Sequence, residues 1–178
     1  MKKIVILISG RGSLLESFKM ASNLELVKVI ANKECDGILL AERLGYTTEV
    51  RKDFNKELAV ELNNLGVEVV VLAGFLKIIS TEFLTEFTGK VVNSHPSLLP
   101  KFGGHGFYGM KVHQAVIDSA ETESGFTIHE VTSDVDAGKI LFQEKIALSD
   151  DETVESLAVK ILELEKKNYP EVVGRIVS

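Results

Sequence analysis

The chain has 178 residues, with 45% hydrophobic residues, 26% charged residues and a formal net charge of −6. This size and apolar content predict one domain over residues 1–178, and the net charge disfavours nucleic acid as the main partner. The one cysteine, Cys35, excludes an internal disulfide framework and fits a reducing compartment. The first apolar run, residues 4–8, is too short for a signal peptide or membrane span. We therefore expect a cytoplasmic protein with no membrane partner.

Short runs rich in Val and Ile alternate with longer amphipathic segments through the first half of the chain. This alternation predicts an α/β fold with a Rossmann-like, mostly parallel sheet flanked by helices. The expected strands lie near residues 3–8, 26–31, 46–50, 67–73 and 90–93. The expected helices lie near residues 13–21, 37–44, 54–65 and 81–87.

The alternation of strand and helix patterns changes after a loop over residues 94–110. A helix near 111–119 precedes two strands, 125–132 and 139–147, which we expect to pair antiparallel as the late strands of the sheet. A capping side chain and first-turn acids in residues 149–152 then signal one long final helix. We expect that helix to close the sheet at Tyr169-Pro170.

A glycine-containing turn, Ser9-Gly10-Arg11-Gly12-Ser13, separates the first strand from the first helix. Its small residues would let backbone N–H groups approach a phosphate at the start of the helix. The turn lacks the third glycine of the dinucleotide fingerprint and the Gly-Lys-Ser/Thr of a Walker loop. A purely structural turn is therefore an equal alternative.

A second polar signal, Asn93-Ser94-His95-Pro96, follows the buried strand near 90–93. If the strand continues through His95, the side chains of Asn93 and His95 project to the same face and converge on one bound atom. The alternative is a capped turn with a hydrogen-bonded surface histidine.

The third signal is the loop Thr132-Ser133-Asp134-Val135-Asp136-Ala137-Gly138 between the late strands. Asp136 can orient a histidine and favour its charged form, although Asp and Gly are also ordinary hairpin residues. Asp134 and Asp136 lack further ligands at a matching spacing, so no metal is predicted. The other histidines are interpreted as structural or surface residues; they are His105, His113 and His129.

Taken together, four ordered motifs resemble the glycinamide ribonucleotide transformylase family, a group of folate-dependent formyltransferases, over nearly the whole chain. They are residues 8–13, residues 71–80, the Asn93-Ser94-His95-Pro96-Ser97-Leu98-Leu99-Pro100 run, and residues 131–138. The related methionyl-tRNA formyltransferases share the Asn-x-His and Ser-Leu-Leu-Pro elements but are longer. The loop over residues 102–110 departs from the shorter loop of many family members, so no contacts are carried over to it.

The resemblance implies two groups of binding residues. Those for the ribonucleotide are Gly12, Ser13, Leu14, which stands where an asparagine is common, and Glu165. Those for 10-formyltetrahydrofolate, the expected co-substrate, are Lys56, Leu76, Lys77, Ile78, Ile79, Asn93, Thr132, Ser133, Asp134, Val135 and Asp136.

The resemblance also implies formyl transfer to the amine of glycinamide ribonucleotide in purine biosynthesis. Asn93 and a protonated His95 would stabilise the oxygen of the tetrahedral carbon, and Asp136 would keep His95 charged or accept the amine proton through water. Two alternatives stay open. They are a formyltetrahydrofolate hydrolase, in which water replaces the amine, and a nucleotide-binding module without catalysis.

Overall fold

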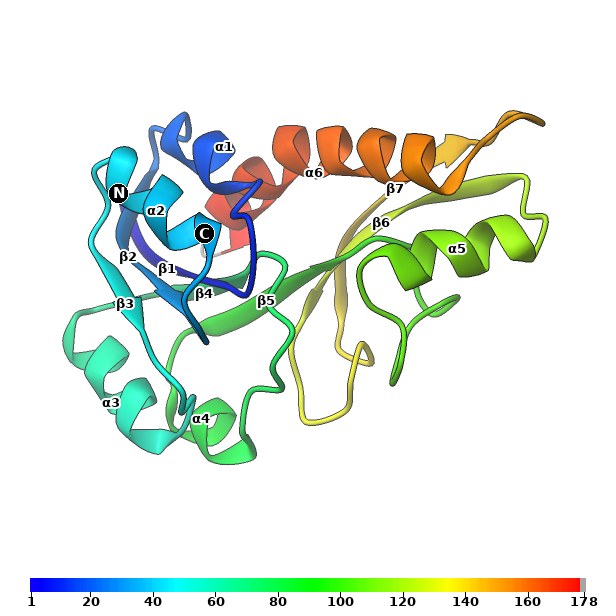
Figure 1. The fold of residues 1–178 in the computed structure, drawn as a ribbon. Coiled ribbons are helices and arrows are strands. Elements are labelled where there is room, and N and C mark those ends of the chain that lie inside the picture. The colour runs from blue at the N-terminus through cyan, green and yellow to red at the C-terminus, as the bar shows by residue number, and fades with distance from the viewer. Residues whose placement is uncertain (177–178) are drawn as a thin grey trace.

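The computed structural model describes residues 1–176 and is organised around one mixed sheet (Figure 1). Its strand order is β3-β2-β1-β4-β5-β6-β7. The parallel strands are β1 (Lys2–Ile8), β2 (Leu24–Ala31), β3 (Thr48–Val50), β4 (Val69–Leu72) and β5 (Lys90–His95). The antiparallel strands are β6 (Glu123–Glu130) and β7 (Ile140–Ala147). The predicted fold class, including the late antiparallel strands, is confirmed.

Helices flank both faces of the sheet. They are α1 (Leu15–Lys19), α2 (Asp36–Arg43), α3 (Lys56–Asn64), α4 (Thr81–Glu86), α5 (Met110–Asp118) and α6 (Val154–Ile176). Successive side chains of a strand point to opposite faces. In β1, Ile4 and Ile6 join a core with residues of α1, α2 and α6, whereas Val5 and Leu7 join a second core with residues of α3 and α4. Figure 1 shows these two helical layers above and below the sheet.

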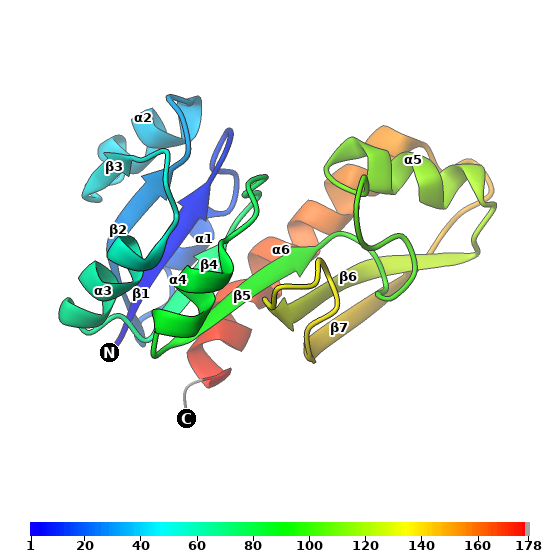
Figure 2. The same cartoon turned by 90° about the horizontal axis from the view of Figure 1, so that it is seen from below.

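The long helix α6 runs across the sheet and joins its two parts (Figure 2). Leu157 and Ile161 near its beginning belong to the same core as Phe126 and Ile128 of β6. Near its end, the Tyr169 hydroxyl donates to the carbonyls of Leu72 and Val92, at 3.1 Å each. Within residues 1–176, no helix combines the length and hydropathy needed to cross a membrane.

Both predicted ends of the final helix were wrong by several residues. At its start Thr153 provides the cap, because its Oγ1 accepts from the Ser156 N–H at 3.1 Å and the Ser156 Oγ accepts from the Thr153 N–H at 3.0 Å. At its end the helix continues through Pro170 to Ile176. Pro170 lacks an N–H for the helical ladder, but it is buried together with Val172 and Val173, so tertiary packing outweighs the local signal.

The order of strands reverses at the middle of the sheet. From β1 the chain moves outward to β2 and β3, and then returns to place β4 on the other side of β1. In open α/β sheets, ligands bind beyond the carboxyl ends of the strands at this reversal. The loops that follow β1 and β4 therefore meet at one edge, next to the end of β5.

Candidate functional site

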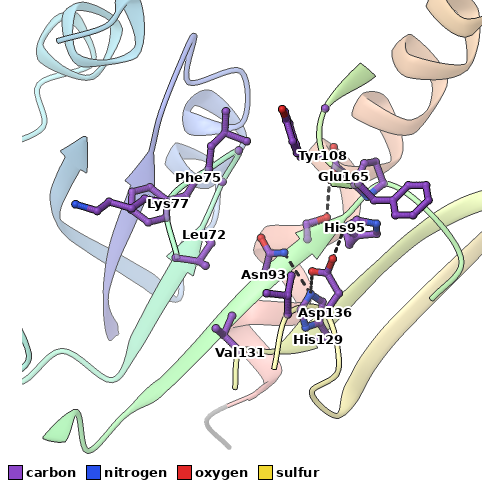
Figure 3. Close-up of a pocket in the computed structure, with 18 of the residues that line it drawn as sticks. Leu72, Phe75, Lys77, Asn93, His95, Tyr108, His129, Val131, Asp136 and Glu165 are labelled. Carbon is purple, nitrogen blue, oxygen red and sulfur yellow. Dashed lines mark hydrogen bonds and ion pairs between the residues drawn. The ribbon is translucent and has the colours of Figure 1, made fainter. Parts of the chain in front are cut away.

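A cavity of about 650 Å³ opens at the carboxyl ends of β1, β4 and β5. Its walls come from the turn after β1, the segment after β4, the end of β5, the β6–β7 loop, the loop over residues 102–110 and helix α6. Most of the residues selected from the sequence line it. Figure 3 shows how Asn93, His95, Asp136 and Glu165 gather on one side of this cavity.

Strand β5 continues through His95, two residues beyond its predicted end. It does so because Asn93 pairs with His129 and His95 pairs with Thr127 of the antiparallel neighbour β6. Asn93 and His95 therefore share one face of the sheet, as the alternation predicted.

The His95 ring is buried and engaged on both of its nitrogens. Its Nε2 donates to the Phe102 carbonyl at 2.7 Å, and its Nδ1 lies 3.5 Å from the Asp136 Oδ2. Burial lowers the pKa of His95 more than the Asp136 charge and the Phe102 carbonyl raise it. Burial therefore opposes the charging of this imidazole that the sequence led us to expect from Asp136.

Asp136 lies between two histidines at the tip of the β6–β7 loop (Figure 3). Its backbone φ is +55°, and its Oδ2 accepts from the Gly104 N–H at 2.9 Å. Burial raises the pKa of Asp136, but the hydrogen bonds from His129 and Gly104 and the electrostatic interactions with His95 and His129 bring that pKa below its ordinary value. The residue is therefore a carboxylate held in place by the cavity wall, and not a simple hairpin former.

His129 is a site residue that the sequence interpretation missed. It is 2% exposed, and its Nδ1 donates to the Glu130 carbonyl at 2.9 Å. Its Nε2 lies 3.2 Å from Asn93 Nδ2 and 3.5 Å from Asp136 Oδ1. With Nδ1 donating to the Glu130 carbonyl, Nε2 is the acceptor for the Asn93 amide. His129 joins the site because β6 pairs antiparallel with β5, which sets it opposite Asn93.

The two other histidines also line the cavity. His105 belongs to the glycine-rich loop, and His113 of α5 is buried without a hydrogen-bond partner for Nδ1. Burial, assisted by His95, lowers the pKa of His113. Across residues 1–176 there is no cluster of three or more His, Cys, Asp or Glu side chains suited to a metal.

The turn after β1 forms one end of the cavity. Gly12 has φ +70°, which favours glycine, and its carbonyl accepts from the Leu15 N–H at 2.9 Å. Ser13 is exposed, whereas the Leu14 side chain packs in the core, which leaves only its backbone for a ligand. Gly12, Ser13 and Leu14 all line the cavity.

The predicted folate segments form another part of the wall. Leu76 and Ile78 are 60% and 64% exposed, so they present apolar side chains at the cavity, and Ile79 is buried beneath them. The Leu76 N–H donates to the Ser9 hydroxyl at 2.9 Å, which ties this segment to the turn after β1. The other predicted folate residues that line the cavity are Lys77, Asn93, Thr132, Ser133, Asp134, Val135 and Asp136.

Lys56 does not line the cavity. It lies in the first turn of α3, and its Nζ is 3.1 Å from Glu86 Oε2 of α4. The structure therefore does not bring Lys56 together with the other predicted site residues.

Glu165 reaches the cavity from α6. Burial raises its pKa to about 7, although a hydrogen bond from Ser94 acts in the opposite direction. An acid in this condition exchanges its proton near neutral pH, which is frequent at functional sites.

An open α/β sheet with a ligand cavity at its switch point, lined by an amide, an imidazole and a carboxylate, is typical of enzymes that act on small molecules. The formyl transferase family matches residues 2–173. The chain belongs to this family.

Individual relatives agree over almost the whole chain. The chain is 37% identical to the chloroplastic phosphoribosylglycinamide formyltransferase of Arabidopsis thaliana, covering 98% of this chain and 65% of the plant protein. It is 34% identical to the phosphoribosylglycinamide formyltransferase of Haemophilus influenzae, covering 97% of this chain and 86% of that protein. It spans 18% of the trifunctional purine biosynthetic protein adenosine-3 of Gallus gallus.

Among solved structures, glycinamide ribonucleotide transformylase 1 from Symbiobacterium toebii has a TM-score of 0.86 at 30% identity. That alignment covers 97% of this chain and 86% of the other.

Proposed function

We propose that this protein transfers the formyl group of 10-formyltetrahydrofolate to the amine of glycinamide ribonucleotide. The observation that carries the proposal is the convergence of Asn93, His95 and Asp136 in one cavity (Figure 3), which the turn at Gly12 also lines. The names of the relatives given above, and the match of the formyl transferase family over residues 2–173, support it. Both substrates are small molecules, and the cavity volume of about 650 Å³ suits a ligand of that kind.

The ribonucleotide phosphate would lie against the backbone of residues 12–14, and Glu165 would accept hydrogen bonds from the same substrate. The folate would lie along the exposed apolar side chains of Leu76 and Ile78. This arrangement brings the amine and the formyl group together beside Asn93.

In the reaction the amine nitrogen attacks the formyl carbon, and the carbon gains a tetrahedral geometry with a negative oxygen. One N–H of the Asn93 amide faces His129, so the second N–H is free to donate to that oxygen. The bond from carbon to the folate nitrogen then breaks. The proton lost by the amine ends on the departing folate nitrogen, by way of water and Asp136.

His95 can contact the formyl oxygen only after its ring breaks one of its two present contacts, with the Phe102 carbonyl or with the Asp136 carboxylate. When its ring leaves the Phe102 carbonyl or Asp136, a nitrogen becomes available to the formyl oxygen. Negative charge on that oxygen and the nearby Asp136 carboxylate both favour the protonated ring, which offsets the effect of burial on its pKa.

The test is incubation of the purified protein with 10-formyltetrahydrofolate and glycinamide ribonucleotide, with separate measurement of formylated amine and free formate. Formylated ribonucleotide at enzymatic rates supports the proposal. Release of formate alone, equal with and without ribonucleotide, would show hydrolysis and refute it.

A further inference from the structure

Ser94 lies between Asn93 and His95 in β5 but serves the opposite face of the sheet. Its neighbour Val92 packs in the core under α6, whereas Val91 packs in the core under α3 and α4. Strand alternation therefore directs Ser94 toward α6. There its hydroxyl donates to Glu165 Oε1 at 2.6 Å.

This contact selects one geometry for the Glu165 carboxylate. A carboxylate has two oxygens, and the serine occupies one of them, so the other is left for a ligand in the cavity. The helix itself is already fixed one turn later, because the Tyr169 hydroxyl donates to the carbonyls of Leu72 and Val92. The Ser94 hydroxyl is therefore not needed to dock α6, and its effect falls on the Glu165 side chain.

We infer that Ser94 is a positioning residue for the ribonucleotide: its hydroxyl holds Glu165 as an oriented acceptor for the hydroxyl or amine groups of that substrate. The inference rests on the proposed function, and it assigns a role to a residue that the catalytic constellation leaves unused. A short hydrogen bond from a hydroxyl to a carboxylate is among the stronger ones in proteins.

The charge state of Glu165 supports this role. Burial raises its pKa to about 7 and the Ser94 hydrogen bond opposes that rise. The Tyr169 hydroxyl on the same helix interacts with it electrostatically, and His113 of α5 and His95 of β5 are titratable groups that line the same cavity. Without the hydroxyl the carboxyl would keep its proton to higher pH and would lose the acceptor that the substrate requires.

The test is calorimetric binding of glycinamide ribonucleotide between pH 6 and 8.5, with formyl transfer followed on the same preparations. We expect Ser94→Ala to weaken binding about tenfold at pH 7, in keeping with the loss of a hydrogen bond to a charged group. The pH midpoint of binding should rise by about one unit. Ser94→Thr keeps the hydroxyl, so its affinity and its pH midpoint of binding should be near those of the wild type. In both variants the KM for the folate and the kcat at saturation should stay near the wild-type values.

Ser97→Ala is the matched control. The Ser97 hydroxyl also makes a 2.6 Å bond, to the Lys101 carbonyl, but it is outside the cavity. This variant should lower stability and leave the pH midpoint of binding unchanged.

The results separate this inference from the proposed function. Wild-type affinity and pH midpoint in Ser94→Ala would overturn the role of Ser94. Ribonucleotide binding without formyl transfer by the wild type would refute the proposed function, and the binding comparison would still decide on Ser94. Absence of ribonucleotide binding by the wild type would overturn both.

Discussion

Replacing Asn93 with Ala separates an effect on the transition state from an effect on the fold. The free N–H of the amide would donate to an oxygen that becomes charged only as the amine adds, so its loss should act mainly on kcat. Removal of one such donor elsewhere costs about 3–4 kcal/mol, or on the order of a hundred- to a thousandfold in rate. We expect a fall in kcat of that size.

The expected loss of stability is much smaller. The structure gives Asn93 one side-chain hydrogen bond, to His129 at 3.2 Å, in a half-buried position. A bond of this kind contributes about 1 kcal/mol, which corresponds to a shift of roughly 2–4 °C in Tm for a domain of this size. The assay is therefore kcat for formyl transfer and Tm on the same preparation.

Asn32→Ala provides the matched control, because Asn32 directly follows β2 at the same edge of the sheet but does not line the cavity. Its buried Oδ1 has no hydrogen-bond partner, so truncation should cost little stability and leave kcat unchanged. A folded Asn93→Ala variant with normal kcat would refute the oxyanion role. An equal fall of kcat in both variants would point to a general effect of altering this edge.

Three further changes test other parts of the site. Asp136→Asn keeps the shape but removes the charge, so kcat should fall on the order of a hundredfold with Tm nearly unchanged; near-normal kcat would remove Asp136 from the mechanism. Gly12→Ala should raise the KM for the ribonucleotide more than that for the folate, because φ is +70° and a Cβ would lie 2.7 Å from Leu15 Cδ1. Gly45 has a similar φ of +86° but lies outside the cavity, so Gly45→Ala is the control and should lower only the Tm. If Gly45→Ala changed the KM values as Gly12→Ala does, the effect would come from backbone strain and not from a lost contact with the ribonucleotide. Glu165→Gln tests pH dependence by urea unfolding. Because folding raises the pKa of Glu165 from 4.5 to about 7, the wild type should lose roughly 3 kcal/mol relative to this variant as pH rises through that window; parallel curves would contradict the raised pKa.

The strands and their order along the chain were accessible from the sequence because each depends on local alternation of apolar residues. In β1, every residue from Ile4 to Ile8 is buried, and the two faces of the strand feed two cores. Two functional positions were also visible near the carboxyl ends of strands, at Gly12 in the turn after β1 and at Asn93 near the end of β5. Helix ends were less accessible, because the burial of Pro170 within α6 depends on what packs around it.

Contacts between distant segments could be decided only by the tertiary structure. The sequence placed Asn93 and His95 in one motif and Asp136 in another, whereas His129 joins the site only because β6 pairs antiparallel with β5. Lys56 lies outside the cavity because α3 packs beside α4, where its ammonium group pairs with Glu86.

The role of Ser94 shows the same division. The sequence alone places Ser94 between two site residues in a strand. Strand alternation then directs its side chain to the face opposite theirs. That α6 brings a carboxyl to meet it, 71 positions later in the chain, followed from packing. The position of a residue in a strand determines the face of the sheet to which its side chain points. The free energy gained by burying α6 against the sheet determines which side chain it contacts on that face.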